Sequence, residues 1–459
     1  MEKQNKESKL ETISSNEQQE HERTSLISNS DIGENYRAIT ETSYFSTRHL
    51  TNEDKLLRTS THYYSLLNIF KGYIGISFLA IPQGFAQVGL YGATIELILI
   101  MILNLYSVYL LVKARNKYKR QPIRNICDLC EQIFGPRAKN AANILLIITE
   151  IQFCVSYTIY FGEQLDQLFC QILPITSCGK KYLYRLLFSI AILPLMYMKQ
   201  LRKIAVFSFF SNVATIVAII LIILVEINII QNQPPQTVQY ENLKIIDIWQ
   251  MPIYFGVAMC LYEGNGLILN LYSEVDKPHK FMNQISLVLS LLTGLGIIVG
   301  ALSYMAFGGK IESIILQNLP NNAIGISIKL MYMITITGIY VLVIYPVFQI
   351  MEDDHKYKNI ARIGENTKFF LFRTLIIALI LGFSMLIPNI TVMLSIVGSI
   401  SGTLISVIVP AVMYNTAYKD SEKKSFRRKM NVIFMIIGSV FGTIGFYESI
   451  RAIIFPKDE

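Results

Sequence analysis

A carboxylate stands beside glycines in the middle of a long apolar run, in the stretch CLYEGNGLILN at residues 260–270. The carboxylate is Glu263, and Gly264 and Gly266 follow it. A charged group at membrane depth is costly unless it is paired or solvated. Burial there would disfavour the charged form and suit Glu263 to exchange a proton. Two interpretations stay open: a role in ion coupling or gating, and a structural carboxylate that bonds an unwound backbone.

A second apolar run is interrupted in the same way. The stretch FKGYIGISFLA at residues 70–80 places Gly72 and Gly75 at mid-span, with Lys71 directly before them. Unwinding at such breaks frees backbone N–H and C=O groups, which are tolerated in a membrane only where they line a cavity or bind a ligand. Half-helix N-termini favour a carboxylate and freed carbonyls favour an ammonium group, so a zwitterion fits. Close helix packing by small residues is the alternative, and the pairing of two breaks favours the binding site.

The predicted site consists of residues at the two breaks and of two hydroxyls in a later apolar run. Substrate-binding candidates are Gly72, Tyr73, Gly75, Ile76, Ser77, Tyr262, Gly264 and Gly266. Candidates for ion coupling or gating are Glu263, Lys71, Thr335 and Thr337. Threonines also commonly bond to the backbone of their own helix. No catalytic residue or cofactor is predicted. Cys127 and Cys130 have the spacing of a metal-ligating pair, but no second cysteine or histidine pair completes a site, so no metal site is predicted either.

The composition is that of a membrane protein. Of 459 residues, 52% are hydrophobic and 16% are charged, and the mean hydropathy is +0.41. Soluble domains carry about a quarter charged residues, and a run of about 20 apolar residues crosses a bilayer. We predict eleven transmembrane helices, at 63–89, 91–113, 141–168, 183–198, 204–230, 249–271, 282–307, 324–350, 369–387, 390–416 and 431–455.

The distribution of charge predicts the orientation. Lysine and arginine gather on alternate loops, which places the polar tail 1–61 in the cytosol. Its composition is that of a disordered segment. The net charge of +8 follows from this topology and does not indicate a nucleic-acid partner. Two short stretches of the tail, at 22–27 and 36–39, resemble sorting signals and favour an endosomal, lysosomal or vacuolar membrane over the plasma membrane.

Two cysteines and three acidic residues complete these expectations. Cys170 and Cys178 lie near a predicted outward loop, where a disulfide is possible, although their partners stay open. Glu96 and Glu226 are expected at the membrane interface, and Glu163 near the outer mouth, with simple solvation favoured there.

Several motifs carry a family resemblance. The stretches FKGYIGISFLAIPQGFAQVGL (70–90) and LYEGNGLILNLYSEVDKPHKF (261–281) resemble the first- and sixth-helix signatures of the amino acid/auxin permease family. The closest branches are the proton-coupled amino acid transporters of animals and the vacuolar amino acid transporters of fungi. Stretches 123–136, 152–165 and 203–213 agree, so the resemblance covers about residues 60–455.

The resemblance implies an all-α membrane protein that transports amino acids. It implies a leucine-transporter-type fold of five-plus-five inverted repeats within a transmembrane domain at 62–455. The repeats would cover about 63–230 and 249–416, followed by an extra helix at 431–455.

The sequence departs from the family pattern near both breaks. Ile76 and Ser77 stand where the family has threonine and glycine, and Asn270 stands where it has proline. Asn68 replaces a histidine of the animal members, so coupling through that histidine is excluded.

The predicted function is secondary active transport of small neutral amino acids by alternating access, with H⁺ favoured over Na⁺ as coupling ion. The alternative is an amino-acid sensor that signals to cytosolic partners. No nucleotide-binding loop or catalytic domain is visible, so an enzyme is not predicted.

Overall fold

The computed structural model describes residues 66, 69–70, 72–118, 123–172, 178–197, 202–232, 244–275, 278–352, 365–421 and 425–455. The predicted cytosolic tail, Asn68 and Lys71 lie outside these described residues.

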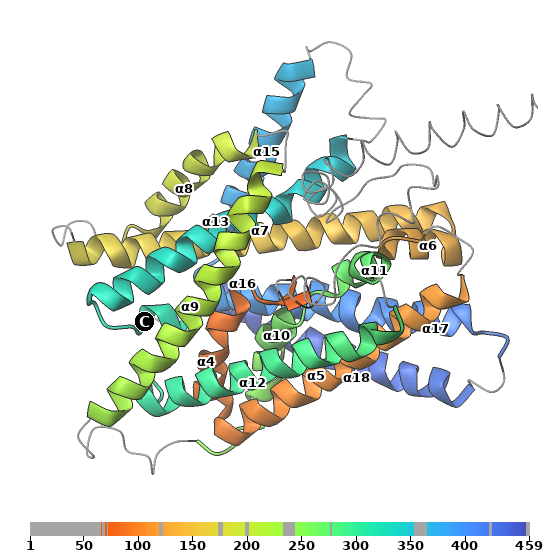
Figure 1. The fold of residues 1–459 in the computed structure, drawn as a ribbon, viewed down its shortest axis with the longest axis horizontal. Coiled ribbons are helices and arrows are strands. Elements are labelled where there is room, and N and C mark those ends of the chain that lie inside the picture. Colours follow the sequence, from red (N-terminus) through yellow and green to blue (C-terminus); the bar gives the residue numbers. More distant parts are fainter. Residues whose placement is uncertain are drawn as a thin grey trace, which may run out of the picture.

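The described chain folds into a bundle of helices (Figure 1). The first half contains α4 (Ser77–Val88), α5 (Leu90–Lys117), α6 (Ile126–Phe134), α7 (Pro136–Ile172), α8 (Lys181–Met196) and α9 (Arg202–Asn232). The second half contains α10 (Met251–Leu261), α11 (Asn265–Glu274), α12 (Phe281–Phe307), α13 (Ala323–Glu352), α15 (Glu365–Leu386), α16 (Ile390–Val397), α17 (Val409–Ala417) and α18 (Ser425–Ile454). Short turns are η4 (Pro278–Lys280), η5 (Ile315–Gln317) and two π-helical turns, η6 (Gly398–Gly402) and η7 (Leu404–Ile408).

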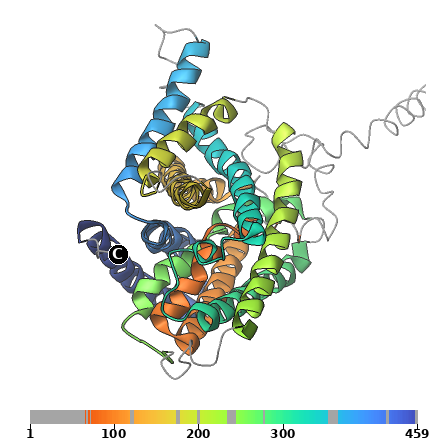
Figure 2. The ribbon, with the colours of Figure 1, turned by 90° about the vertical axis from the view of Figure 1, so that its left-hand side faces the viewer.

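Eight helical segments of the described chain are long and apolar enough to cross a membrane. They are Leu90–Lys117, Pro136–Cys170, Val213–Asn232, Pro278–Phe307, Ala323–Glu352, Thr367–Leu386, Ile390–Ala417 and Ser425–Ile454. Large apolar side chains such as Leu99, Leu375 and Ile436 are exposed on them, as a lipid-facing surface requires. Figure 2 shows α15 and α18 at the edge of the bundle, and α15 also stands at the upper edge in Figure 1.

Both predicted helix breaks are present. In the first run the helical residues end at Tyr73, and α4 begins at Ser77 after three non-helical residues. In the second run α10 ends at Leu261, and α11 begins at Asn265. Neither α4 nor α11 receives a side-chain cap at its N-terminus. Two half-helices therefore begin inside the bundle with first-turn N–H groups that no capping side chain occupies.

The second break lies against the π-helical part of the chain. Here α10 packs on α16, η6 and α18. The backbones meet so closely that a Cβ on Gly398 would lie 1.8 Å from the carbonyl oxygen of Gly256. A Cβ on Gly402 would lie 3.2 Å from Oε2 of Glu263. π-helical turns inside helices frequently mark functional sites. Their position beside Glu263 therefore makes the contact between α10 and η6 a candidate part of the functional site.

Three side chains tie the segment 311–319, which joins α12 to α13, to neighbouring helices. Gln317 donates from Nε2 to Glu163 of α7 at 3.0 Å. The Gln317 carbonyl accepts from Gln167 at 2.7 Å. Thr391 of α16 donates to the carbonyl of Ser313 at 3.0 Å. The expectation of a solvated Glu163 is wrong, because its other oxygen accepts from the backbone N–H of Ile390 at 3.0 Å and its side chain is buried.

A disulfide joins Cys170, near the end of α7, to Cys178, just before α8, with their Cα atoms 4.7 Å apart. The pairing that the sequence left open is thus the one between these two cysteines. Disulfides persist in oxidising compartments.

Replacing Cys178 with serine should lower the thermal stability of the purified protein. The disulfide closes a loop with a sequence separation of 8. Closing a loop of this length lowers the conformational entropy of the unfolded chain, which stabilises the folded protein by about 2–3 kcal/mol. Thermal unfolding in detergent measures the loss, and Cys127→Ser is the control for thiol removal as such. An unchanged melting temperature, with Cys170 already open to a thiol reagent in the wild type, would contradict the disulfide.

Candidate functional site

The two helix breaks contact each other. The Tyr73 hydroxyl donates to Oδ1 of Asn265 at 3.2 Å. The Asn265 amide in turn donates to the Ser107 hydroxyl of α5 at 3.2 Å. A Cβ on Gly264 would lie 2.7 Å from the Tyr73 ring, so the ring rests on bare backbone. Gly264 is therefore a close-approach glycine that lets the two interrupted segments meet.

The carbonyl oxygen of Tyr262, freed by the second break, is held from two sides. It accepts from the backbone N–H of Gly264 at 2.9 Å and from the Asn104 amide of α5 at 2.9 Å. The Tyr262 hydroxyl lies 2.7 Å from Oγ1 of Thr293 on α12 and is fully buried. The side chain of Tyr262 thus anchors the break to α12, while its backbone belongs to the candidate site.

The first break combines open space with buried side chains. A Cβ on Gly72 or on Gly75 would meet no described atom within 4 Å. Ile76 and Ser77 are buried, and the Ser77 hydroxyl hydrogen-bonds Cys260 of α10. The structure therefore brings the backbone of the first break and the end of α10 together.

The two predicted threonines lie on α13. Thr335 is buried, and the Thr337 hydroxyl donates to the carbonyl of Met333 in its own helix at 2.9 Å. For Thr337 this is the structural alternative considered from the sequence. Lys71, the remaining candidate, lies outside the described residues.

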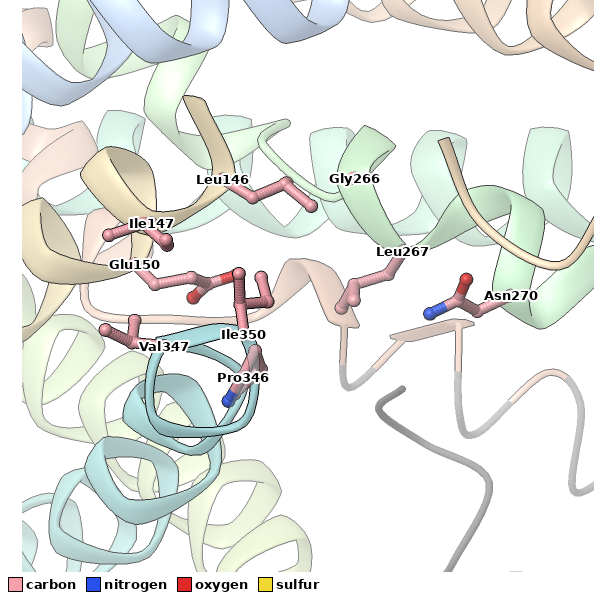
Figure 3. Close-up of a pocket in the computed structure, with 9 residues that line it drawn as sticks. All are labelled: Leu146, Ile147, Glu150, Gly266, Leu267, Asn270, Pro346, Val347 and Ile350. Carbon is pink, nitrogen blue, oxygen red and sulfur yellow. The ribbon is translucent and has the colours of Figure 1, made fainter. Parts of the chain in front are cut away.

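Two carboxylates make up the acidic part of the site: Glu263 beside the second break, and Glu150, which lines a small cavity (Figure 3). Both carboxylate oxygens of Glu263 are buried and have no hydrogen-bond partner among the described residues. The cavity lies between α7, α11 and α13, and it is lined by Leu146, Ile147, Glu150, Gly266, Leu267, Asn270, Pro346, Val347 and Ile350. Of the predicted residues that the structure describes, only Gly266 lines this cavity. Glu150 and Asn270 were not predicted, although Asn270 in place of the family's proline was a signal.

The described residues contain no group of three or more histidine, cysteine or acidic side chains able to hold a metal ion. Cys127 and Cys130 are both buried in α6. Burial raises the pKa of Cys130 to about 11 and raises the pKa of Cys127 as well. Both thiols therefore stay protonated at neutral pH, which does not suit a metal ligand or a redox pair.

The fold and site define an all-helical membrane protein with interrupted helices at its centre. A family model described as transmembrane amino acid transporter protein matches residues 58–451, and the chain belongs to this family. Amino acid transport is therefore the activity of its class, and the prediction that the chain is not an enzyme agrees with the names of its relatives.

Two relatives come from Arabidopsis thaliana. Amino acid transporter AVT3B is 26% identical over 402 residues, covering 86% of this chain and 94% of the relative. Amino acid transporter ANT1 is 23% identical over 406 residues, covering 84% of this chain and 91% of the relative.

The fold is similar to that of MhsT, whose crystal structure was solved in complex with L-phenylalanine. The TM-score is 0.55 at 11% sequence identity, and the match covers 85% of this chain and 99% of MhsT. At this identity the likeness concerns the fold alone.

Proposed function

We propose that the protein is a secondary active transporter that moves small neutral amino acids by alternating access, coupled to protons. The observation that carries the proposal is the contact between the two helix breaks through Tyr73, Gly264 and Asn265. Two interrupted helices that meet inside a bundle supply both kinds of group that a zwitterion needs.

The uncapped N-termini of α4 and α11 suit the carboxylate of the substrate, because first-turn N–H groups and the helix dipole favour an anion. The freed backbone of the first break suits the ammonium group. MhsT, which shares the fold, was solved with L-phenylalanine, a neutral amino acid. This supports a neutral substrate.

The membrane arrangement belongs to the same proposal. Eleven spans result when the interrupted first run, α8 with its 16 residues and the α10–α11 pair are added to the eight long helices. The two breaks would then occupy matching places in inverted repeats at about 63–230 and 249–416. The positive-inside pattern and the Cys170–Cys178 disulfide support a cytosolic N-terminus, and the sorting-like stretches support an endosomal, lysosomal or vacuolar membrane.

Uptake of a labelled mixture of neutral amino acids into proteoliposomes tests the proposal. We expect saturable uptake that an inward proton gradient accelerates. In Glu263→Gln the extra uptake driven by the gradient should fall by about ten-fold or more, because the amide cannot carry the proton. Counterflow exchange at equal pH should persist in the variant.

Absence of both uptake and counterflow, in wild-type protein whose melting temperature rises on adding amino acids, would replace transport with sensing. Uptake that ignores the proton gradient would remove proton coupling and leave Glu263 a structural group.

A further inference from the structure

Glu263 lacks a compensating group among its described neighbours. Both of its carboxylate oxygens are buried without a hydrogen-bond partner in the described part of the chain. An ionised carboxylate in such surroundings is strongly destabilising unless a proton or a cation accompanies it. The site beside Gly402 and the second helix break is therefore built to hold one of the two.

Among the described residues, the charged group that acts on Glu263 is a second carboxylate. Glu150 of α7 repels the charge of Glu263. Two carboxylates that share a buried site do not ionise together and titrate as a pair. The other titratable groups facing them are thiols: Cys154 of α7 beside Glu150, and Cys260 of α10 beside Glu263. Thiols supply no positive charge, so within the described residues the pair is uncompensated.

The cavity gives an independent indication of a ligand. The Glu150 side chain extends into it from α7, and Asn270 faces it from α11 (Figure 3). Asn270 is 8% exposed, and its Oδ1 atom has no hydrogen-bond partner among the described residues. The rest of the lining does not titrate: Leu146, Ile147, Gly266, Leu267, Pro346, Val347 and Ile350.

The chemistry of this lining favours a proton over a larger cation. A metal cation such as Ca²⁺ takes six or more oxygen ligands, whereas the cavity offers one carboxylate and one amide between apolar side chains. An organic cation would likewise need several acceptors around its N–H groups. A proton needs a single acceptor and a partner from which to move.

We propose that Glu150 and Glu263 hold one proton between them and that the cavity beside Asn270 is the route by which it enters and leaves. In the transfer the O–H bond of the Glu150 carboxyl group breaks and its proton passes to a water molecule, which hands a proton on to the Glu263 carboxylate as an O–H bond forms there. Glu263 then gives this proton up to water, and Glu150, which is ionised, takes the next proton from a hydronium ion that reaches the cavity. The inference rests on the proposed function, because it assigns the coupling proton of that transporter to two named groups.

The test measures proton movement and amino-acid movement together, in proteoliposomes that hold the full chain and a pH-sensitive dye. The variants are Glu150→Gln, Glu263→Gln and the double variant. Each single variant should lose substrate-driven proton entry by about ten-fold or more while keeping counterflow exchange at equal pH. The double variant should lose no more than either single one, because interacting groups are not additive.

Two other buried carboxylates provide matched controls. Both oxygens of Glu96 on α5 are buried without a described hydrogen-bond partner, and its charge acts on Tyr254. Glu226 on α9 accepts a hydrogen bond from Ser303. We expect Glu96→Gln and Glu226→Gln to keep substrate-driven proton entry.

Retained proton entry in Glu150→Gln, or an equal loss in Glu96→Gln, would overturn the assignment. So would a Glu150→Gln variant that loses uptake of basic amino acids only, since the pair would then hold a substrate's cationic group. Failure of the proposed function is seen separately, as a wild type with neither uptake nor counterflow.

Discussion

Gly398→Ala is expected to leave little folded protein. The added Cβ would lie 1.8 Å from the carbonyl oxygen of Gly256 and 2.7 Å from the backbone nitrogen of Cys260. Both atoms belong to the backbone of α10, so no side chain can rotate away. Overpacking of a close contact costs about 1–3 kcal/mol and occasionally more, and here we expect at least the upper value. Thermal unfolding of the purified protein, with its yield as a folded peak in size-exclusion chromatography, measures the effect.

Gly294→Ala on α12 is the matched control, because a Cβ there would meet nothing within 4 Å. Its helix propensity should improve by about 0.8–1 kcal/mol, so its melting temperature should stay equal or rise. A Gly398→Ala protein as stable as Gly294→Ala would show that α10 and η6 are not packed backbone to backbone.

Gly264→Ala is expected to reduce amino acid uptake by about ten-fold or more, even where the protein still folds. The new methyl group would lie 2.7 Å from the Tyr73 ring and would push apart the two breaks that form the proposed site. A displacement of about 1 Å at a site that positions reacting or bound groups costs about 10²-fold in rate. Initial uptake rates in proteoliposomes, normalised to folded protein, provide the measurement.

A double-mutant cycle with Tyr73→Ala separates this contact from a general loss of stability. Removing the ring makes room for the methyl group, so Gly264→Ala should destabilise the Tyr73→Ala protein less than the wild type. Residues in contact show coupling of about 0.5–3 kcal/mol. Strictly additive changes in melting temperature would place the ring elsewhere.

The breaks were predictable because glycine and charge are visible in the sequence at membrane depth. The partners of these residues were not, since they depend on how distant helices pack. Nothing local to Tyr73 indicates that its hydroxyl meets Asn265, or that Asn104 holds the carbonyl of Tyr262. The disulfide was anticipated only as a possibility, because spacing cannot place two sulfur atoms within bonding distance.

Acidic side chains were the weakest part of the prediction. Glu96 and Glu226, expected at the membrane interface, are 4% and 0% exposed. Position along an apolar run shows depth in the membrane, whereas burial depends on which face of the helix meets its neighbours. The π-helical turns η6 and η7 were also missed, because the residues Gly398–Ile408 are compatible with an ordinary α-helix. Their widened backbone accompanies the close contact with α10, which no local pattern reports.

The hydrogen bonds of the segment 311–319 set the free-energy cost of opening the disulfide-bearing end of the bundle. Freeing it from α7 and α16 means exchanging three hydrogen bonds, from Gln317, Gln167 and Thr391, for bonds to water. At about 0.5–1.5 kcal/mol each, the exchange costs roughly 1.5–4.5 kcal/mol. An equilibrium with that bias keeps roughly 0.05–7% of molecules in the opened form. Under the proposed alternating access most copies would then rest closed toward the disulfide side.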